Sequence, residues 1–191
     1  MSPQFDAHLR NRGLFDSGAS HWIDAGEEIV TFPLWAAGGG LVGYQRYAWN
    51  LPKERSNKGR YFTWISEYIK PLALWGMEYA LNKKEPKRGY FSPALIITEG
   101  VFDAIRCIQC GFRACAILTA TPSRQFVQWF RQLTHGQIVL AVKDNDENNA
   151  GDGLDKLAFM GYNVLHAKDI GDLDVNAADE FLHETLANWC Y

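Results

Sequence analysis

The sequence contains no long apolar run. No stretch approaches the roughly 18–20 apolar residues that a membrane-spanning helix requires, and the N-terminus lacks the basic region and apolar segment of a signal peptide. We therefore expect no membrane association. The hydrophobic fraction of 47% is ordinary for a globular protein, and 191 residues allow one large domain or two small ones.

Cysteine is scarce, with four residues in the chain. Cys107, Cys110 and Cys115 cluster in an apolar stretch, whereas Cys190 stands apart. Structural zinc usually takes two ligand pairs, and neither a second C-x-x-C nor a paired histidine motif is present. We interpret the cluster as buried free thiols, which indicates a reducing, cytoplasmic location.

Several catalytic signatures are also missing. The sequence has no G-x-x-x-x-G-K-[ST] loop, so no ATP-driven motor is expected, and no G-x-S-x-G, H-E-x-x-H or deaminase-type zinc motif. An EF-hand calcium loop is imitated from Asp144 onwards. However, its sixth position is Asn149 instead of glycine, its twelfth is Asp155 instead of glutamate, and the preceding V-L-A-V is typical of a strand. We therefore set the calcium loop aside.

Charge is unevenly distributed, although the net charge is only −3. Residues 1–91 hold twelve Lys and Arg against nine Asp and Glu, whereas residues 92–191 hold seven against thirteen. A basic front half beside an acidic back half suits a polyanion platform next to a metal site. Chance asymmetry would give the same numbers, so charge alone does not decide between the two interpretations.

The front half is predicted to be a small mixed α+β unit. Helical spacing predicts a helix over residues 3–12, ended by Gly13. β-branched and aromatic runs predict three strands, the first two joined as a hairpin. These strands are residues 29–32, 41–47 and 61–65, and further helices are predicted near residues 17–23 and at 72–81. The charged connector at residues 83–89 predicts a domain boundary, giving domains at 1–91 and 92–191.

From residue 92 onwards, predicted strands and helices alternate. The strands are residues 94–98, 114–118, 138–142 and 162–166, and the helices are residues 102–110, 121–133 with Thr121 as cap, 152–160 and 177–187. Continuous apolar strands that alternate with helices predict an α/β fold with a Rossmann-like, mainly parallel sheet.

Acidic residues follow three of the predicted strands. They are Glu99 after the first strand, Asp144 and Asp146 after the third, and Asp169, Asp172 and Asp174 after the fourth. Because the carboxyl ends of parallel strands meet at one edge, these carboxylates would repel one another unless cations intervened. Hard oxygen ligands suit Mg²⁺ or Mn²⁺ and two-metal phosphoryl or nucleotidyl transfer. For any single acid, a helix cap or a solvated turn stays the alternative.

Three stretches resemble a known domain. They read L-I-I-T-E-G-V-F-D-A-I, then G-F-R-A-C-A-I-L-T-A-T, then I-V-L-A-V-K-D-N-D-E-N-N-A-G, with a later D-L-D-V-N. In this order they resemble the toprim domain of DnaG-type primases, topoisomerases and OLD-family nucleases. Upstream, H-L-R-N-R-G-L, I-V-T-F-P-L-W, G-L-V-G-Y-Q-R, G-R-Y-F-T-W and L-W-G-M-E-Y-A-L resemble the primase segment that precedes toprim. In primases that segment forms a mixed subdomain that presents basic residues to template and nucleotides.

The resemblance implies roles for acidic residues. Glu99 would accept the proton of the attacking hydroxyl and lie close to the metals, and Asp103 would orient its loop or a neighbouring basic group. Gly100 would let backbone approach a phosphate. The metal ligands it implies are Glu99, Asp144, Asp146, Asp172 and Asp174.

The resemblance also implies basic contacts. Arg46, Lys58 and Arg60 would touch phosphates of template or nucleotide, with solvated loop charge as the alternative. Lys143 departs from the family, which mostly has an apolar residue there, and would contact a phosphate or face solvent.

The first hypothesis is a primase-type nucleotidyltransferase that makes short RNA primers on single-stranded DNA from nucleoside triphosphates. The family's zinc-ribbon and helicase parts are not found in this sequence, and its G-T pair after the second strand is Ala120-Thr121 here. We therefore expect a minimal, phage-like core that acts in a bacterial host cell with a separate helicase or template-recognition protein. A toprim nuclease and a non-catalytic adaptor that binds nucleic acid or a replication protein stay open as alternatives.

Overall fold

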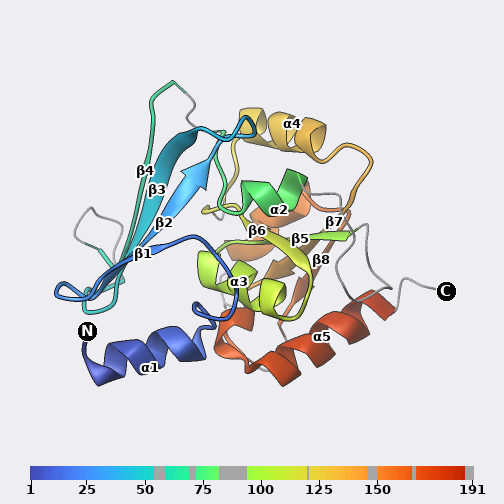
Figure 1. Cartoon of the computed structure of the whole chain (residues 1–191). Helices are drawn as coiled ribbons and strands as arrows, with labels where there is room; N and C mark the ends of the chain where they lie inside the picture. The colour runs from blue at the N-terminus through green and yellow to red at the C-terminus, as the bar shows by residue number, and fades with distance from the viewer. Residues whose placement is uncertain are drawn as a thin grey trace.

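Two four-stranded sheets, one antiparallel and one parallel, organise the chain (Figure 1). The structure is a computed structural model that describes residues 1–53, 59–68, 72–81, 94–119, 121–145, 150–164 and 167–187. The elements before the parallel sheet are α1 (Pro3–Asn11), β1 (Trp22–Asp24), β2 (Ile29–Trp35), β3 (Leu41–Ala48), β4 (Tyr61–Ile65) and α2 (Met77–Leu81). Those that follow are β5 (Ala94–Thr98), α3 (Val101–Gln109), β6 (Arg113–Ala116), α4 (Arg124–Leu133), β7 (Ile138–Lys143), η1 (Ala150–Lys156), β8 (Met160–Asn163), η2 (Ile170–Asp172) and α5 (Val175–Ala187).

Helix α1 begins and ends where local chemistry requires. The Ser2 side chain accepts a hydrogen bond from the Phe5 backbone N–H, which satisfies one unpaired donor of the first turn. Gly13 follows the helix with φ 74°, a left-handed conformation that glycine adopts without strain. Phe5 and Leu9 are fully buried, as their spacing predicts. Helix and stop are therefore confirmed.

The antiparallel sheet has the order β1-β2-β3-β4 and presents two chemically different faces. Because side chains alternate along a strand, Val30, Phe32 and Leu34 of β2 all point to one face, where they are fully buried. We call this the inner face, and Tyr47 of β3 lies on it too. The predicted hairpin between β2 and β3 is confirmed, and β2 continues through Pro33 to Trp35.

The parallel sheet has the order β6-β5-β7-β8, and all three pairings are parallel. Residues that alternate along each strand separate into two cores. One core holds Ile96, Ala114 and Leu140 with α3 and α5, and the other holds Ile97 and Cys115 with α2 and α4. Figure 1 shows α3 and α5 on one side of the sheet and α2 and α4 on the other. The predicted α/β class, with a mixed unit ahead of a parallel sheet, is confirmed.

A single core joins the two sheets through Phe102 of α3. Its ring meets Phe32 edge-on at 5.5 Å and Tyr47 at 5.0 Å between centroids. The Tyr47 hydroxyl lies 2.8 Å from Nε2 of His8 in α1, and burial lowers the pKa of that histidine to about 4. The predicted boundary near residue 91 lies outside the described residues, so the division into two domains stays a prediction.

Some predicted helices are shorter or absent. Trp75 exchanges two backbone hydrogen bonds of 3.0 Å with Ala116, so the segment predicted as a helix from residue 72 first covers the edge of β6. Gly76 then turns with φ 83° before α2 begins. No helix forms at residues 17–23, where β1 begins instead, and residues 152–160 give a 3₁₀ turn and the start of β8. Tertiary pairing overrides local propensity in these segments.

Three of the four cysteines lie in the described residues. Cys107, Cys110 and Cys115 are buried thiols that form no disulfide, as predicted, while Cys190 lies outside the described ranges. In the part of the chain that the structure describes, no helix combines the length and apolar character that crossing a membrane requires.

A substitution at Gly43 tests how closely the backbones of β3 and β4 approach each other. A Cβ at this position would lie 2.3 Å from the Trp64 carbonyl oxygen, so backbone would have to move. We expect Gly43→Ala to lower the free energy of unfolding by about 1–3 kcal/mol, measured by urea denaturation. A Cβ at Gly38 meets nothing within 4 Å, so Gly38→Ala should stay within about 0.5 kcal/mol of the parent. Equal effects of the two substitutions would contradict the proposed close approach.

Candidate active site

The ends of β5 and β7 mark a switch point in the parallel sheet. The chain moves from β5 outward to β6 and then returns past β5 to β7, so β5 and β7 are neighbours whose connections leave in opposite directions. Open sheets bind ligands at the carboxyl ends of such strands. Glu99 directly follows β5 and Asp144 directly follows β7. The structure therefore brings these two predicted residues to one edge.

A cleft of about 460 Å³ opens at this edge, between the two sheets. Its acidic wall comes from the parallel-sheet unit and comprises Glu99, Gly100, Asp103, Asp144 and Asp169. Its other wall comes from the front half and comprises Arg12, Gln45, Lys53, Tyr61 and Thr63. Val101, Phe102 and Leu118 complete the lining. Carboxylates therefore face cationic and hydroxyl groups across one space, an arrangement that suits a metal-bound phosphate compound.

Gly100 makes room for the acidic wall. It occupies the N-cap position of α3, and a Cβ there would lie 2.5 Å from Oδ2 of Asp103. The Thr98 hydroxyl donates a hydrogen bond of 2.9 Å to the Gly100 carbonyl oxygen and holds the turn. The E-G-x-x-D spacing thus places the Asp103 carboxyl back over the start of its own helix.

Asp103 is a buried carboxyl that favours its protonated form. Its Oδ1 accepts a hydrogen bond of 3.1 Å from the Gly171 backbone N–H. Burial raises the pKa of Asp103 well above its usual range, the carboxylates of Asp169 and Asp144 raise it further, and Arg12 opposes them. Asp103 therefore holds η2 against α3, and the role that the resemblance implies for it in the site stays a prediction.

Arg12 is one of three charged cleft residues, with Lys53 and Asp169, for which the sequence predicted no role in the site. Its guanidinium forms ion pairs with Asp103 at 3.8 Å, with Asp169 at 3.4 Å, and with Asp172. It also lies over the Phe102 ring, 5.0 Å from the centroid. Burial lowers the pKa of Arg12, but these carboxylates outweigh burial and the net pKa is raised. The available signal was its place in H-L-R-N-R-G-L, to which no role was given.

Arg106 supports the same corner from inside α3. Its side chain is buried, and it donates to the Gln109 side chain at 2.7 Å, to the Gly171 carbonyl oxygen at 3.4 Å, and to the Asn11 carbonyl oxygen. The end of α1, helix α3 and the η2 turn are therefore tied together behind the acidic wall.

The three acidic residues that follow β8, namely Asp169, Asp172 and Asp174, have different positions: the first two lie at or beside the cleft, and the third caps a helix. Asp169, which was not assigned to the site, lines the cleft, and Asp172 reaches it through Arg12. Oδ1 of Asp174 accepts a hydrogen bond of 2.9 Å from the Ala177 backbone N–H at the start of α5. The structure places Asp174 as a helix cap and does not bring it to the lining of the cleft.

The predicted basic residues lie apart from one another. Arg46 points to the face opposite Gln45, and its guanidinium lies 5.6 Å from the Phe62 ring centroid. Nε of Arg60 donates to the Leu51 carbonyl oxygen at 2.9 Å. Neither residue is part of the cleft lining.

Of the lysines near the site, Lys143 and Lys53 are described by the structure. Nζ of Lys143 pairs with Asp155 at 2.9 Å, so this lysine contacts a carboxylate of its own chain. Lys53, which had no assigned role, lines the cleft. Lys58 and Asp146 lie outside the described residues, and their predicted roles stay predictions.

The backbone at Leu118 shows strain beside the acidic wall. Leu118 has φ 64°, a left-handed conformation that a branched side chain rarely adopts. Its N–H donates to the Glu99 carbonyl oxygen at 3.1 Å, which fixes the strained residue at the cleft. Such strain clusters at functional sites.

The donor set fits a divalent cation in kind. Mg²⁺ is usually held by one or two carboxylates together with substrate phosphates, and Glu99 and Asp144 both line the cleft. Within the described ranges, no three carboxylate, histidine or cysteine side chains lie close enough to hold an ion by themselves. The predicted ligand Asp146 lies outside the described residues. The five-ligand set predicted from the sequence therefore stays a prediction.

No family model matches the sequence, and no curated protein matches it either. Solved structures are similar to it in fold. The RNA polymerase domain of Mycobacterium tuberculosis primase DnaG superposes with TM-score 0.61 at 17% identity, covering 96% of this chain and 62% of that one. A DNA primase domain from Pseudomonas aeruginosa gives 0.61 at 18% identity, with coverages of 98% and 59%.

A phage structure is similar as well. The primase domains of two gp4 subunits of bacteriophage T7, bound to an RNA/DNA hybrid and dTTP, give TM-score 0.64 at 16% identity, covering 92% of this chain and 85% of that one. The chain spans less than two thirds of the mycobacterial and Pseudomonas structures. It therefore resembles the catalytic core of DnaG-type primases and has the fold of that core.

The raised pKa of Asp103 predicts a pH-dependent stability. A carboxyl whose pKa is raised by folding stabilises the fold below its usual pKa, and this contribution is lost as pH rises through the raised value. Asp103→Asn mimics the protonated carboxyl. We therefore expect the stability of the parent relative to Asp103→Asn to fall as pH rises from about 4 to 9, measured by urea denaturation.

The comparison variant is Asp103→Ala. It leaves the buried Gly171 N–H without its acceptor and should be less stable than Asp103→Asn by about 1–3 kcal/mol throughout this pH range. If the free energy of unfolding of the parent instead rises with pH relative to that of Asp103→Asn, folding lowers the pKa of Asp103 and the prediction is wrong.

Proposed function

We propose that this chain is a primase-type nucleotidyltransferase that joins ribonucleotides into short RNA primers on single-stranded DNA with Mg²⁺ or Mn²⁺. One observation carries the proposal. A fold shared with primase catalytic cores has its acidic residues at the switch point of a parallel sheet, in a cleft whose opposite wall carries Arg12 and Lys53. Acids and cations face each other where a polymerising site would hold a nucleoside triphosphate.

The chain's own residues divide the work. Glu99 stands at the end of β5, where its carboxylate accepts the proton of the primer 3′-hydroxyl as that oxygen attacks the α-phosphate. The bond between the α-phosphorus and the α,β-bridging oxygen breaks, and pyrophosphate leaves. Lys53 binds phosphate oxygens from the opposite wall. Asp144 and Glu99 would hold the divalent cation, which would supply positive charge beside the attacking and leaving oxygens. In this toprim-type site, Asp146 is the proposed third ligand.

Asp103 and Arg12 are positioning residues in this scheme. They fix the acidic wall and engage each other and Asp169 rather than the substrate. The basic and polar wall comes from a different part of the chain, so alignment of the two walls depends on this contact. Template and nucleoside triphosphates are the proposed ligands, and a separate helicase or template-recognition protein is the proposed partner.

Primer synthesis tests the proposal directly. The full chain is incubated with single-stranded DNA of mixed sequence, labelled nucleotides and Mg²⁺ or Mn²⁺. We expect short labelled products that fall about 100-fold or more in Glu99→Gln and Asp144→Asn, because each removes a carboxylate from the cleft. The matched control is Glu184→Gln on α5, an exposed acid outside the cleft, which should keep full activity.

The outcomes separate the competing functions. Degradation of DNA or RNA without added nucleotides, lost in the same two variants, would replace the primase by a toprim nuclease. Absence of both activities, together with nucleic-acid binding that is independent of metal and survives Asp144→Asn, would leave a non-catalytic adaptor.

We expect Lys53 to contribute an electrostatic contact to a phosphate of the template. Lys53→Ala should weaken binding to single-stranded DNA and lower the magnitude of the salt slope of log K by about 0.7, the contribution of one neutralised phosphate. Lys156 is exposed in η1 outside the cleft, so Lys156→Ala should leave affinity and slope unchanged. Fluorescence anisotropy of a labelled oligonucleotide across a salt series measures both. Identical slopes for parent and Lys53→Ala would mean that Lys53 makes no phosphate contact.

A further inference from the structure

The outer face of the antiparallel sheet, opposite the inner face that packs on Phe102, carries a continuous set of aromatic side chains. Residues paired across an antiparallel sheet point to the same side. One row across the four strands comprises Trp22, Thr31, Arg46 and Phe62, and the neighbouring row comprises Pro33, Tyr44 and Trp64. We call Trp22, Tyr44, Arg46, Phe62 and Trp64 the stacking platform.

Three rings of the stacking platform, those of Tyr44, Phe62 and Trp64, form ring contacts, and Phe62 also contacts a cation. Tyr44 and Trp64 are stacked, with centroids 5.8 Å apart and an interplanar angle of 26°. Tyr44 lies 6.3 Å from Phe62, and the Arg46 guanidinium lies over the Phe62 ring at 5.6 Å. Successive outward residues of a strand are about 6.6 Å apart, so the rows offer flat surfaces at regular intervals.

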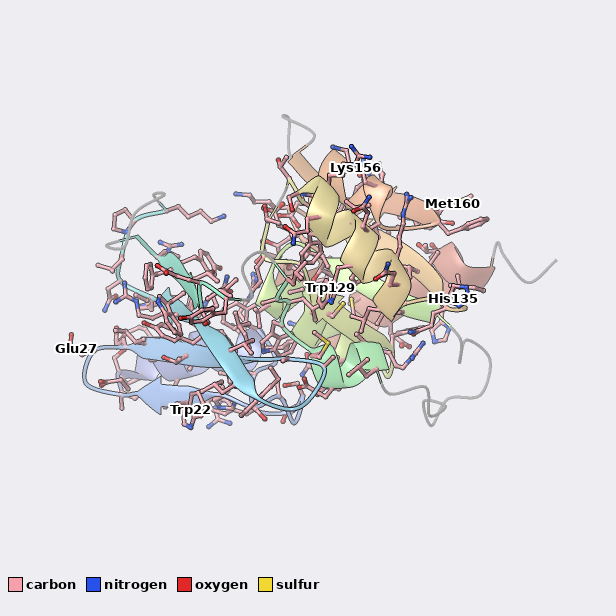
Figure 2. All side chains as sticks on the ribbon, turned by 90° about the horizontal axis from the view of Figure 1, so that it is seen from above. Trp22, Glu27, Trp129, His135, Lys156 and Met160 are labelled. Carbon is pink, nitrogen blue, oxygen red and sulfur yellow. The ribbon has the colours of Figure 1, made fainter. Side chains whose placement is uncertain are left out.

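Large parts of these rings face solvent. The exposed fraction is 55% for Trp22, 50% for Trp64 and 36% for Tyr44. Exposed aromatic rings that gather on one face, rather than scatter singly, mark a binding surface. Figure 2 shows Trp22 on the antiparallel sheet, at the other end of the molecule from Met160 on the parallel-sheet unit.

The edge strand β4 connects this face to the cleft. Tyr61 and Thr63 point to the cleft and line it, while Phe62 and Trp64 alternate with them and point to the outer face. β4 is the last strand of the sheet, so a chain leaving the cleft reaches the outer face by crossing a single strand. A ligand long enough to pass that edge can occupy both surfaces together.

We propose that the stacking platform binds the bases of single-stranded nucleic acid, as a continuation of the template path out of the cleft. Stacking of bases on aromatic side chains, with an arginine among them, is how sheet surfaces hold single strands without reading their sequence. The direction of the path rests on the proposed function, whereas binding to the platform does not.

The composition of the platform favours nucleic acid over a protein partner. Its exposed groups are the aromatic rings of Trp22, Tyr44 and Trp64, beside the half-buried Arg46. The front half of the chain has an excess of three positive charges, from twelve Lys and Arg against nine Asp and Glu. A polyanion with flat bases satisfies both features at once, and the cleft that adjoins the platform carries a lysine on the same half.

The test measures binding of the full chain to a fluorescein-labelled oligothymidylate by anisotropy, without nucleotides or metal. Tyr44→Ala/Trp64→Ala should weaken binding about tenfold or more, because base–aromatic contacts are lost. The salt slope should stay unchanged, since no phosphate contact is removed. The matched control is Phe159→Ala, which removes an aromatic ring that is 71% exposed on the other unit and should bind as the parent does.

A conservative variant separates stacking from folding. Trp64→Phe keeps a ring and should keep most of the affinity, while the quenching of tryptophan fluorescence that DNA causes in the parent should be reduced. Unchanged affinity in the double variant, with circular dichroism like that of the parent, would overturn the proposal and leave the platform as a protein-docking surface. Primer synthesis by a double variant with unchanged DNA affinity would keep the proposed function while overturning the platform. A parent that makes no primers, but whose DNA affinity falls in the double variant, would keep the platform while overturning the proposed function.

Discussion

The buried guanidinium of Arg12 holds the two halves of the cleft in place. It belongs to the front half, yet its partners Asp103, Asp169 and Asp172 all belong to the parallel-sheet unit. Desolvated charges are costly unless paired, so separating the two units would leave these groups buried without compensation. The same side chain stacks on Phe102, around which the rings of Phe32 and Tyr47 pack. Ionic and aromatic contacts thus fix one geometry, and the width of the cleft follows from it.

This arrangement explains why the site draws on distant parts of the sequence. The parallel sheet supplies carboxylates at a switch point, where strand connections diverge and leave the edge open. The antiparallel sheet supplies the cationic and polar wall, including Lys53 and Thr63. A fold alone does not determine chemistry, because one fold hosts many activities. Carboxylates and a lysine that face each other across the cleft therefore support the proposed chemistry, and the chain shares its fold with primase catalytic cores.

The alternation of side chains in β3 and β4 gives one small sheet two roles. Gln45 and Thr63 turn to the cleft, with their side chains hydrogen-bonded at 3.0 Å, whereas the neighbouring Arg46 and Trp64 turn outward. A slip of one residue in the pairing would exchange these faces. Gly43 favours this register, because a Cβ at this position of β3 would collide with the Trp64 carbonyl oxygen.

The sequence by itself determined most of the alternation of strands and helices after residue 94, the predicted helix at 152–160 excepted. It also determined the hairpin of β2 and β3 and the placing of Glu99 and Asp144 directly after two strands of the parallel sheet. These features depend on local periodicity and on motif spacing, which a single chain segment displays. Tertiary structure decided what segment spacing does not encode: that Arg12 pairs with Asp103 and Asp169 of the acidic wall, and that Lys53 lines the cleft whereas Arg46 does not. It also replaced a predicted helical turn by the pairing of Trp75 with Ala116. Each of these depends on contacts between residues far apart in the chain, whose free energy exceeds any local preference.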